Sequence, residues 1–257
     1  MRMPRAIVWD VDGTLAETER DGHRVAFNEA FARHGLPWHW DEAHYGDLLR
    51  VAGGRERLVH DLERRPDGPA DAASRQDLAR ALHQTKNRLY ADIVGSGRIP
   101  LRPGVPELLA ECRARGVPMG IATTSSRANV TALLASRLGA DWERWFDAIV
   151  CGEDVSGKKP DPEAYDKVTA ALGVSAGTAL AIEDSPDGAA AARKAGLPVI
   201  VTRSHYFRDA AIDGAVAIGP GFGQRDGWVP PPAAEGTATG GVSFDDLRAW
   251  FTRGVDR

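Results

Sequence analysis

Short apolar runs alternate with amphipathic stretches over most of this chain. Runs of three or four apolar residues between polar or turn-forming residues predict buried strands. These predicted strands are Ala6–Trp9, Met119–Ala122, Ala148–Val150, Ala179–Ile182 and Pro198–Val201. Helical patterns that stop at or beside a glycine separate the later runs, and they are Val105–Arg115, Arg127–Leu138, Pro162–Leu172 and Asp187–Ala195. This alternation predicts an α/β fold, a Rossmann-like, doubly wound parallel sheet with helices on both faces.

One long segment interrupts the alternation. Residues 17–97 are rich in helical patterns, contain no convincing strand and follow directly after the first predicted strand. We therefore predict an inserted α-helical cap domain over residues 17–97, and a core made of residues 1–16 and 98–257. The first cap helix is expected over Gly22–His34. Its buried side would carry Val25, Phe27, Ala30 and Phe31.

The last part of the core changes character. Residues 219–257 begin with a loop rich in glycine and proline and end in a helical pattern over Val242–Arg253. Ser243 is placed to cap this helix, with Asp246 three residues later in a weaker form of the capping box. The loop is either an ordered wrap over the core or partly mobile, and the pattern leaves both open.

Composition removes several classes of partner. The formal net charge of −4 provides no basic surface for nucleic acid. No apolar run approaches the roughly 18–20 residues needed to span a bilayer, and the N-terminus resembles no targeting segment. Two cysteines, Cys112 and Cys151, have no metal-site or disulfide spacing. We expect a cytoplasmic protein, monomeric or weakly dimeric, without nucleic-acid or membrane partners.

Two carboxylates stand where the first predicted strand ends. Asp10 and Asp12 are two residues apart, so both can point to the same side of the chain. Gly13 allows a sharp bend that leaves backbone N–H groups open to an anion. A calcium loop of the EF-hand type is excluded, because Leu15 stands where that loop needs glycine. A plain Asp-Gly turn is the alternative.

Polar residues also follow the other strands. Hydroxyls at 123–126 follow the second run, Lys159 precedes Pro160 after the third, and Glu183 and Asp184 follow the fourth. Each has an ordinary alternative: a helix cap, a solvated surface lysine, or an acidic helix start. In an open parallel sheet these strand ends meet at one edge. Together they predict one site for a divalent cation and a phosphate group.

Phosphoryl chemistry fits this set. A phosphate monoester repels an anionic nucleophile until Mg²⁺ and a lysine neutralise its charge. Mg²⁺ prefers oxygen ligands, which Asp10, Glu183, Asp184 and the backbone carbonyl of Asp12 can provide. Asp10 would attack phosphorus and form an acyl phosphate. Asp12 would protonate the leaving alkoxide and later deprotonate water.

The same segments resemble a known superfamily. Residues 10–14, Thr123, Lys159 with Pro160, and Glu183 with Asp184 stand in the order of the four motifs of the haloacid dehalogenase superfamily. The resemblance covers about residues 5–220 and includes a small helical cap after the first motif. It implies a nucleophile at Asp10, an acid/base at Asp12, phosphate binders at Thr123 and Lys159, and metal-side acids at Glu183 and Asp184.

A narrower resemblance is to the CbbY-like group, which removes one phosphate from xylulose 1,5-bisphosphate, and to its relative β-phosphoglucomutase. Residues 16–19, 23–28, 53–57 and 122–125 carry it. It implies substrate contacts from the cap and core, and the expected residues are Glu17, His23, Arg55, Lys86, Thr124 and Ser125. Three departures concern the substrate: an extra residue before His23, Arg55 in place of lysine, and Asp187 in place of asparagine.

Three functions follow from these residues. The first is a Mg²⁺-dependent phosphatase of a small sugar phosphate, with a bisphosphate such as xylulose 1,5-bisphosphate as its substrate. The second is a phosphomutase, which would return the phosphoryl group from Asp10 to a sugar. The third is a non-enzymatic binding module. Loss of Asp10, Lys159 or Asp184 would favour that third function, and all three residues are present.

Overall fold

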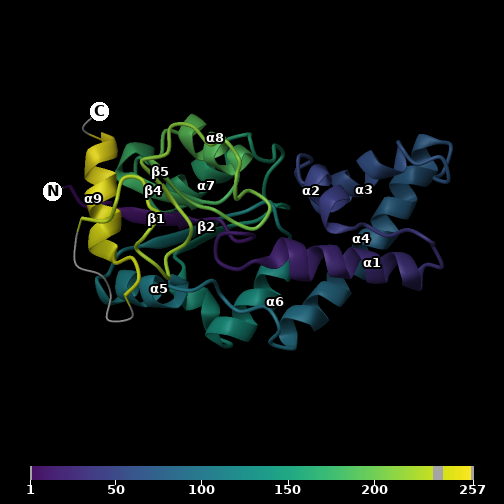
Figure 1. Cartoon of the computed structure of the whole chain (residues 1–257), viewed down its shortest axis with the longest axis horizontal. Coiled ribbons are helices and arrows are strands. Elements are labelled where there is room, and N and C mark those ends of the chain that lie inside the picture. The colour runs from purple at the N-terminus through teal and green to yellow at the C-terminus, as the bar shows by residue number, and fades with distance from the viewer. Residues whose placement is uncertain (1, 234–239, 256–257) are drawn as a thin grey trace.

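A parallel sheet and a group of helices form the two ends of the molecule (Figure 1). The computed structural model describes residues 2–233 and 240–255, so parts of the predicted 219–257 segment lie outside the described residues. Helices α1 to α4 gather at one end, and the sheet lies toward the other. The predicted α/β class is confirmed. The division into core and cap at residues 16/17 and 97/98 stays a prediction.

In the described residues, six parallel strands form one sheet in the order β3-β2-β1-β4-β5-β6. The strands are β1 (Ala6–Trp9), β2 (Met119–Ala122), β3 (Ala148–Val150), β4 (Ala179–Glu183), β5 (Val199–Thr202) and β6 (Ala217–Gly219). Trp9 in the central strand pairs with Ile121 on one side and with Ile182 on the other. The order of strands reverses between β1 and β4, where such sheets bind their ligands.

Helices cover both faces of the sheet (Figure 1). Those of the core are α5 (Val105–Ala114), α6 (Arg127–Leu138), α7 (Glu163–Ala171), α8 (Pro186–Lys194) and α9 (Phe244–Val255). β1 is buried on both faces because its side chains alternate: Ile7 and Trp9 join the cluster with α5 and α6, while Ala6 and Val8 join that with α7 and α8. Two separate apolar layers therefore hold the strand that ends at Asp10.

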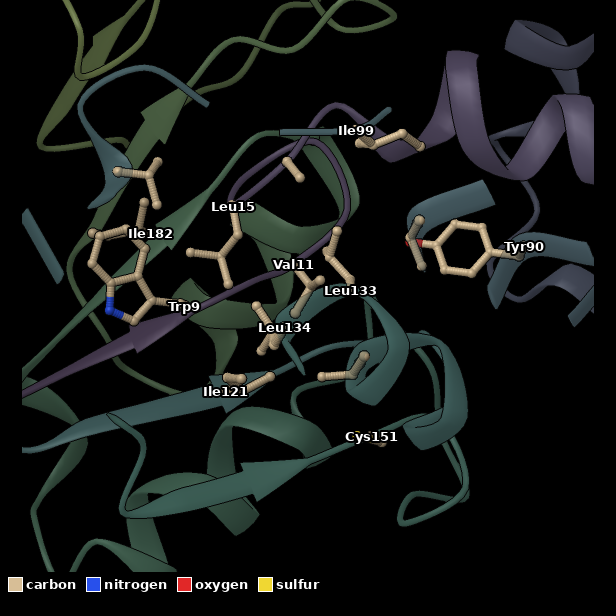
Figure 2. Close-up of a cluster of buried hydrophobic side chains, with 14 of the residues drawn as sticks. Trp9, Val11, Leu15, Tyr90, Ile99, Ile121, Leu133, Leu134, Cys151 and Ile182 are labelled. Atoms are coloured by element: carbon tan, nitrogen blue, oxygen red, sulfur yellow. The ribbon is translucent and has the colours of Figure 1, made fainter. Parts of the chain in front are cut away.

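The first of these layers continues toward the cap. The cap helices are α1 (Arg24–Arg33), α2 (Glu42–Leu48), α3 (Gly54–Leu62) and α4 (Ala72–Gly95). Figure 2 shows Trp9 and Leu15 on the sheet side of the cluster and Tyr90 and Ile99 toward the cap. Helix α4 packs on core helix α6. One continuous apolar cluster thus joins the sheet to the helices that face its ligand-binding edge.

The predicted elements were largely confirmed. Residues 17–97, all of them described, contain helices and no strand. Helix α6 has the predicted bounds, β4 and α5 differ from the prediction by one residue at one end, β5, α7 and α8 by one residue at each end, and α9 by two residues at each end. The sixth strand, Ala217–Gly219, was not predicted, because it runs into the Gly219-Pro220-Gly221 stretch that the sequence indicates as a loop.

The first cap helix differs from its prediction. Glu19–His23 form a π-helix, and α1 begins only at Arg24. A π-turn accommodates one more residue than an α-turn, and the extra residue noted before His23 falls here. Val25, predicted to be buried, is 38% exposed, and Ala26 is buried instead. Both residues lie within α1, where Val25 is about 200° around the helix from the buried Phe27.

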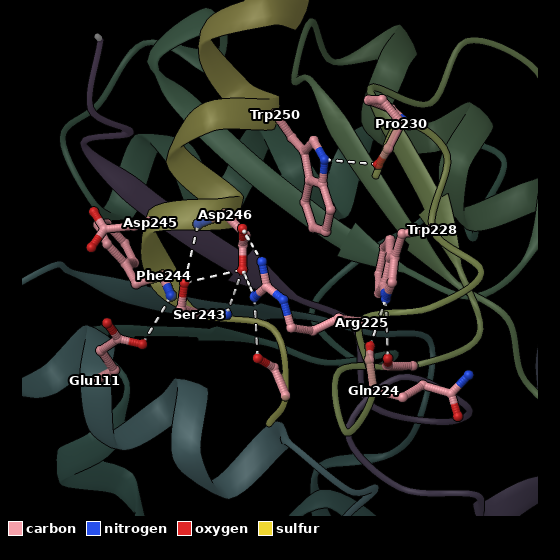
Figure 3. Close-up of polar contacts among 12 residues, drawn as sticks. Glu111, Gln224, Arg225, Trp228, Pro230, Ser243, Phe244, Asp245, Asp246 and Trp250 are labelled. Carbon is pink, nitrogen blue, oxygen red and sulfur yellow. Dashed lines mark hydrogen bonds and ion pairs between the residues drawn. The ribbon is translucent and has the colours of Figure 1, made fainter. Parts of the chain in front are cut away.

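The described part of the C-terminal segment is an ordered wrap over the core (Figure 3). Ser243 N donates to Asp246 Oδ2 at 3.0 Å and Asp246 N donates to Ser243 Oγ at 3.4 Å, so the predicted capping box is confirmed. Arg225 pairs with Asp246, and Trp228 stacks on Trp250 at 4.7 Å. In Figure 1, α9 lies at the end of the sheet away from the cap.

Candidate active site

Three carboxylates and a lysine meet at the carboxyl edge of the sheet. Asp10, Glu183 and Asp184 each offer an oxygen within 4.8 Å of the others. Lys159 Nζ lies 2.6 Å from Asp10 Oδ1 and 2.6 Å from Glu183 Oε1. Asp10 follows β1, Glu183 ends β4, and Lys159 lies in the loop after β3. The predicted meeting of these strand ends is therefore present in the fold.

The backbone at Gly13 lets the loop of residues 10–14 approach Asp184. Gly13 has φ +84°, and a Cβ added there would lie 2.0 Å from Asp184 Oδ2. Any other residue would push Asp184 away from the loop that carries Asp10. Ser185 follows Asp184 and caps α8 by accepting from Gly188 N at 3.1 Å. This cap fixes the turn on which Asp184 stands.

Burial makes the carboxylates costly to ionise without a cation. Burial raises the pKa of Asp10 to about 7; Lys159 opposes this shift, and Glu183 and Asp12 add to it. The pKa of Asp184 is raised well above its usual value by burial and by Asp10 and Glu183. A bound cation would relieve this repulsion. The cluster offers oxygen ligands, the set that suits a hard ion such as Mg²⁺.

Glu183 differs from its two neighbours. It is fully buried, and its Oε1 accepts hydrogen bonds from Lys159 Nζ and from Tyr165 OH, each at 2.6 Å. These bonds fix the carboxylate in place. They occupy Oε1, so this oxygen is less available to a metal ion. Asp10 and Asp184 therefore hold the oxygens that are best placed for a cation, while Glu183 orients Lys159.

Asp12 is held by the cap as well as by the core. Thr18 Oγ1 donates to Asp12 Oδ1 at 2.5 Å, His23 Nε2 lies 2.9 Å from the same oxygen, and Ser125 Oγ donates to Oδ2. Burial acts to raise the pKa of Asp12, but His23 and the two hydroxyls outweigh it and hold the pKa well below its usual range. In this arrangement Asp12 is an ionised base.

His23 connects Asp12 to the cap helix α4. Its Nδ1 lies 2.8 Å from Lys86 Nζ, and its ring stacks on Tyr90 with centroids 4.1 Å apart. Burial lowers the pKa of Lys86 to about 7. When Lys86 is charged it can only donate, and then His23 Nδ1 accepts and Nε2 donates to Asp12. The predicted substrate residues His23 and Lys86 thus contact each other and the catalytic loop.

A cavity of about 630 Å³ lies between core and cap, and residues of both line it. The predicted site residues on its wall are Asp10, Asp12, Glu17, His23, Arg55, Lys86, Thr123, Thr124, Ser125, Lys159 and Asp184. The neighbouring Arg24 does not line the cavity; it lies beside Trp40 and Glu42.

Some hydroxyls and acids also have local structural partners. Thr123 Oγ1 accepts from Ser125 N at 3.1 Å, which shapes the loop after β2. Ser126 caps α6, so the helix-cap alternative holds for this one hydroxyl. Glu17 accepts from His205 N at 3.2 Å and lies 3.7 Å from Arg102 Nε. Glu17 therefore joins the start of the cap to the loop after β5.

Several lining residues were missed by the sequence argument. They are Glu19, Arg50, Glu56, Arg57, His83, Lys158, Ser204, Tyr206 and Phe207. Residues 204–207 lie just after β5. A search for polar residues after the fifth predicted strand, as was done for the first four, would have identified this segment. Glu19, Glu56 and Arg57 lie in the segments 16–19 and 53–57 that carry the CbbY-like resemblance, whereas Arg50 and His83 carry no such signal, since only the folded cap brings them to the cavity.

The comparison with known proteins agrees with this geometry. The family model for haloacid dehalogenase-like hydrolases matches residues 4–196. This chain belongs to that family. Protein CbbY from Cupriavidus necator is 44% identical over 247 residues, 96% of each chain. Phosphoglycolate phosphatase from Rhodospirillum rubrum is 31% identical, covering 93% of this chain and 96% of that one. Membership and these relatives establish the protein as a phosphatase, a phosphoric monoester hydrolase.

Solved structures share the fold of this chain. CbbY from Rhodobacter sphaeroides, a variant in complex with xylulose 1,5-bisphosphate, superposes with a TM-score of 0.80 at 39% identity, covering 88% of this chain and 97% of that one. β-Phosphoglucomutase from Clostridium difficile, at 18% identity and a TM-score of 0.74, shares the fold. None of the described helices combines the length and apolar character that a bilayer span requires.

Proposed function

We propose that this phosphatase removes one phosphate from a small sugar bisphosphate, with Mg²⁺ and an aspartyl phosphate on Asp10. The main support is the buried group of Asp10, Lys159 and Asp184 in a cavity that residues of both core and cap line. Xylulose 1,5-bisphosphate is the leading candidate, because a CbbY relative was solved in complex with it.

Asp10 is the proposed nucleophile. Its carboxylate oxygen would form a bond to phosphorus, and the bond from phosphorus to the sugar oxygen would break. Lys159 stays charged, because Asp10 and Glu183 outweigh the burial that acts to lower its pKa. Lys159 and Thr123 both line the cavity and would bind phosphate oxygens. They would thereby hold the phosphoryl group in line with Asp10.

Asp12 is the proposed acid and base. The low pKa of Asp12 in the described arrangement suits the base, which takes a proton from the water that attacks the acyl phosphate. Attack by that water releases inorganic phosphate and restores the carboxylate of Asp10. To protonate the leaving sugar oxygen, Asp12 must first hold a proton. A bound phosphate dianion would favour this, because a nearby negative charge raises the pKa of a carboxyl group.

Asp10 and Asp184, with the backbone carbonyl of Asp12, are the proposed ligands of Mg²⁺. The ion would neutralise charge on the phosphate oxygens. Glu183 would not bind the ion directly but would orient Lys159, in agreement with its hydrogen bonds to Lys159 and Tyr165.

A phosphomutase is the alternative on the same residues. It would pass the phosphoryl group from Asp10 to a second sugar oxygen instead of to water, so it would depend on a sugar 1,6-bisphosphate. A panel of sugar mono- and bisphosphates with Mg²⁺, read out as phosphate release and as isomerised product, separates the two activities. Isomerised product without phosphate release would contradict the hydrolase.

Arg55 is expected to bind the second phosphate. It lines the cavity, its side chain is 52% exposed, and its contact with Glu56 is long at 3.6 Å, so it is free to reorient. Arg55→Ala should raise KM for xylulose 1,5-bisphosphate about tenfold, since a charge-assisted hydrogen bond is lost. The KM of p-nitrophenyl phosphate, which has no second anion, should rise much less.

Arg64→Ala is the matched control, because Arg64 is an exposed arginine just beyond α3 and does not line the cavity. Equal losses on both substrates in Arg55→Ala would instead assign Arg55 to the fold or to the transferred phosphate. A flat activity profile across mono- and bisphosphates would contradict the bisphosphate assignment.

A further inference from the structure

Glu56 lies between two cations on the wall of the cavity. It stands in the first turn of α3, and its Oε2 is 2.9 Å from Lys158 Nζ in the core loop before α7. Its Oε1 is 3.6 Å from Arg55 Nη2 in the cap. All three side chains line the cavity, and Lys158 directly precedes the catalytic Lys159. A single carboxylate thus bridges cap and core beside the space for the substrate.

The local backbone leaves room for this contact. Gly53 has φ +94°, and a Cβ there would lie 2.3 Å from Glu56 Oε2 and 2.4 Å from Lys158 Nζ. The ion pair therefore packs directly over a glycine. Burial acts to raise the pKa of Glu56, but Lys158 and a backbone hydrogen bond outweigh it and keep the pKa below its usual value. Glu56 is ionised near neutral pH.

Most buried cations of the cavity already have close partners. Lys159 binds Asp10 and Glu183, Lys86 contacts His23, and Arg57 donates to Tyr45 OH at 2.8 Å. These contacts hold the catalytic centre and the cap together. His83 is no added cation, because burial lowers its pKa to about 4. Arg55 and Lys158 differ from these groups, since they share one carboxylate at the cavity wall.

We propose that Lys158 and Arg55 exchange Glu56 for the second phosphate of the substrate when a bisphosphate binds. In the substrate-free protein, the carboxylate of Glu56 is the anionic partner that this phosphate replaces. The proposal rests on the proposed bisphosphate activity and adds Lys158 as a core residue that determines specificity. A phosphate dianion carries more charge and one more acceptor oxygen than a carboxylate, so it can displace Glu56. A monophosphate gains nothing from this exchange.

The test measures kcat and KM for xylulose 1,5-bisphosphate and for p-nitrophenyl phosphate in two variants. Lys158→Ala should raise KM for the bisphosphate about tenfold, since it removes a cation from the phosphate. Glu56→Gln should lower that KM about threefold, since it removes a competing negative charge. In both variants KM should change more than kcat, and the bisphosphate should be affected more than p-nitrophenyl phosphate.

The exchange predicts KM changes of opposite sign in Lys158→Ala and Glu56→Gln. An ion pair that only joins cap and core predicts changes of the same sign. If both variants raise KM for the bisphosphate, the ion pair only closes the cap, and the proposal is overturned. Lys158→Arg should keep KM near that of the wild type, because the charge is retained. If Lys158→Ala does not fold, as judged by circular dichroism, Glu56→Gln alone decides: a lower KM for the bisphosphate supports the exchange, and a higher KM overturns it.

Asp77→Asn and Arg80→Ala are the matched controls. They break an exposed ion pair of the same 2.9 Å length on α4, outside the cavity, and should leave both KM values unchanged. A wild-type enzyme without preference for the bisphosphate would contradict the proposed function, and the exchange with it. If the wild type prefers the bisphosphate but both variants shift its KM in the same direction, only the exchange is contradicted.

Discussion

Asp10→Asn is expected to lower kcat roughly 10⁴- to 10⁶-fold, as loss of a nucleophile does in other covalent mechanisms. The amide is nearly the same size as the carboxylate but cannot attack phosphorus. The fold should persist, because the oxygen of the introduced amide can still accept from Lys159, which lies 2.6 Å from Asp10 Oδ1 in the wild type. At about pH 8 the metal-free variant should melt at the same or a higher temperature, since the raised pKa makes ionised Asp10 destabilising there.

Phosphate release under single-turnover conditions and thermal melting followed by circular dichroism check this result. Asp141→Asn is the control, because Asp141 is exposed and lies outside the cavity. Beryllium or aluminium fluoride should inhibit the wild type only with Mg²⁺ present, as expected for mimics of a phosphoryl group on Asp10. Near-normal turnover by Asp10→Asn would remove the covalent mechanism and leave direct attack by water.

Asp184→Asn is expected to raise the Mg²⁺ concentration for half-maximal activity about 10- to 100-fold, a typical cost of disturbing a metal site. Asp184 contributes one of three clustered carboxylates and faces the glycine of the first motif. The same change should appear without substrate. Mg²⁺ should raise the melting temperature of the wild type by mass action and that of the variant much less.

Asp187→Asn provides the comparison for this experiment. Asp187 also lines the cavity and lies three residues later, in the first turn of α8. It does not belong to the clustered carboxylates, so its removal should shift the Mg²⁺ titration less. Equal shifts in the two variants would indicate a general effect of negative charge and would refute direct ligation by Asp184. Ca²⁺ should substitute poorly in the wild type, because its coordination is larger and looser.

The catalytic edge could be predicted from sequence because strand ends are local signals. An apolar run that stops at Asp10, or at Glu183 and Asp184, marks both the end of a strand and the residues beyond it. Parallel strands place all these ends at one edge, so the meeting of distant motifs follows from topology alone. Even the capping of α9 by Ser243 was readable, since it depends on residues three apart.

The cap was predicted as a helical insertion but not in its details. The π-helix Glu19–His23 was not predicted, because a pattern of apolar residues gives the buried face of a helix and not the type of its turns. Val25 is exposed and Ala26 buried, because Val25 lies about 200° around α1 from Phe27. His23 and Lys86, predicted to bind the substrate, line the cavity, and the fold also links them to the first motif: Lys86 contacts His23, and His23 contacts Asp12.

The sequence by itself determined the fold class and which polar residues stand after each strand. It also indicated phosphoryl chemistry for them. These properties depend on local patterns and on the topology of parallel sheets. Only the tertiary structure decided how the charges are distributed among partners. Glu183 orients Lys159, His23 lowers the pKa of Asp12, and Glu56 holds Lys158. Charges interact through space and respond to burial, so their partners emerge only when cap and core enclose one cavity.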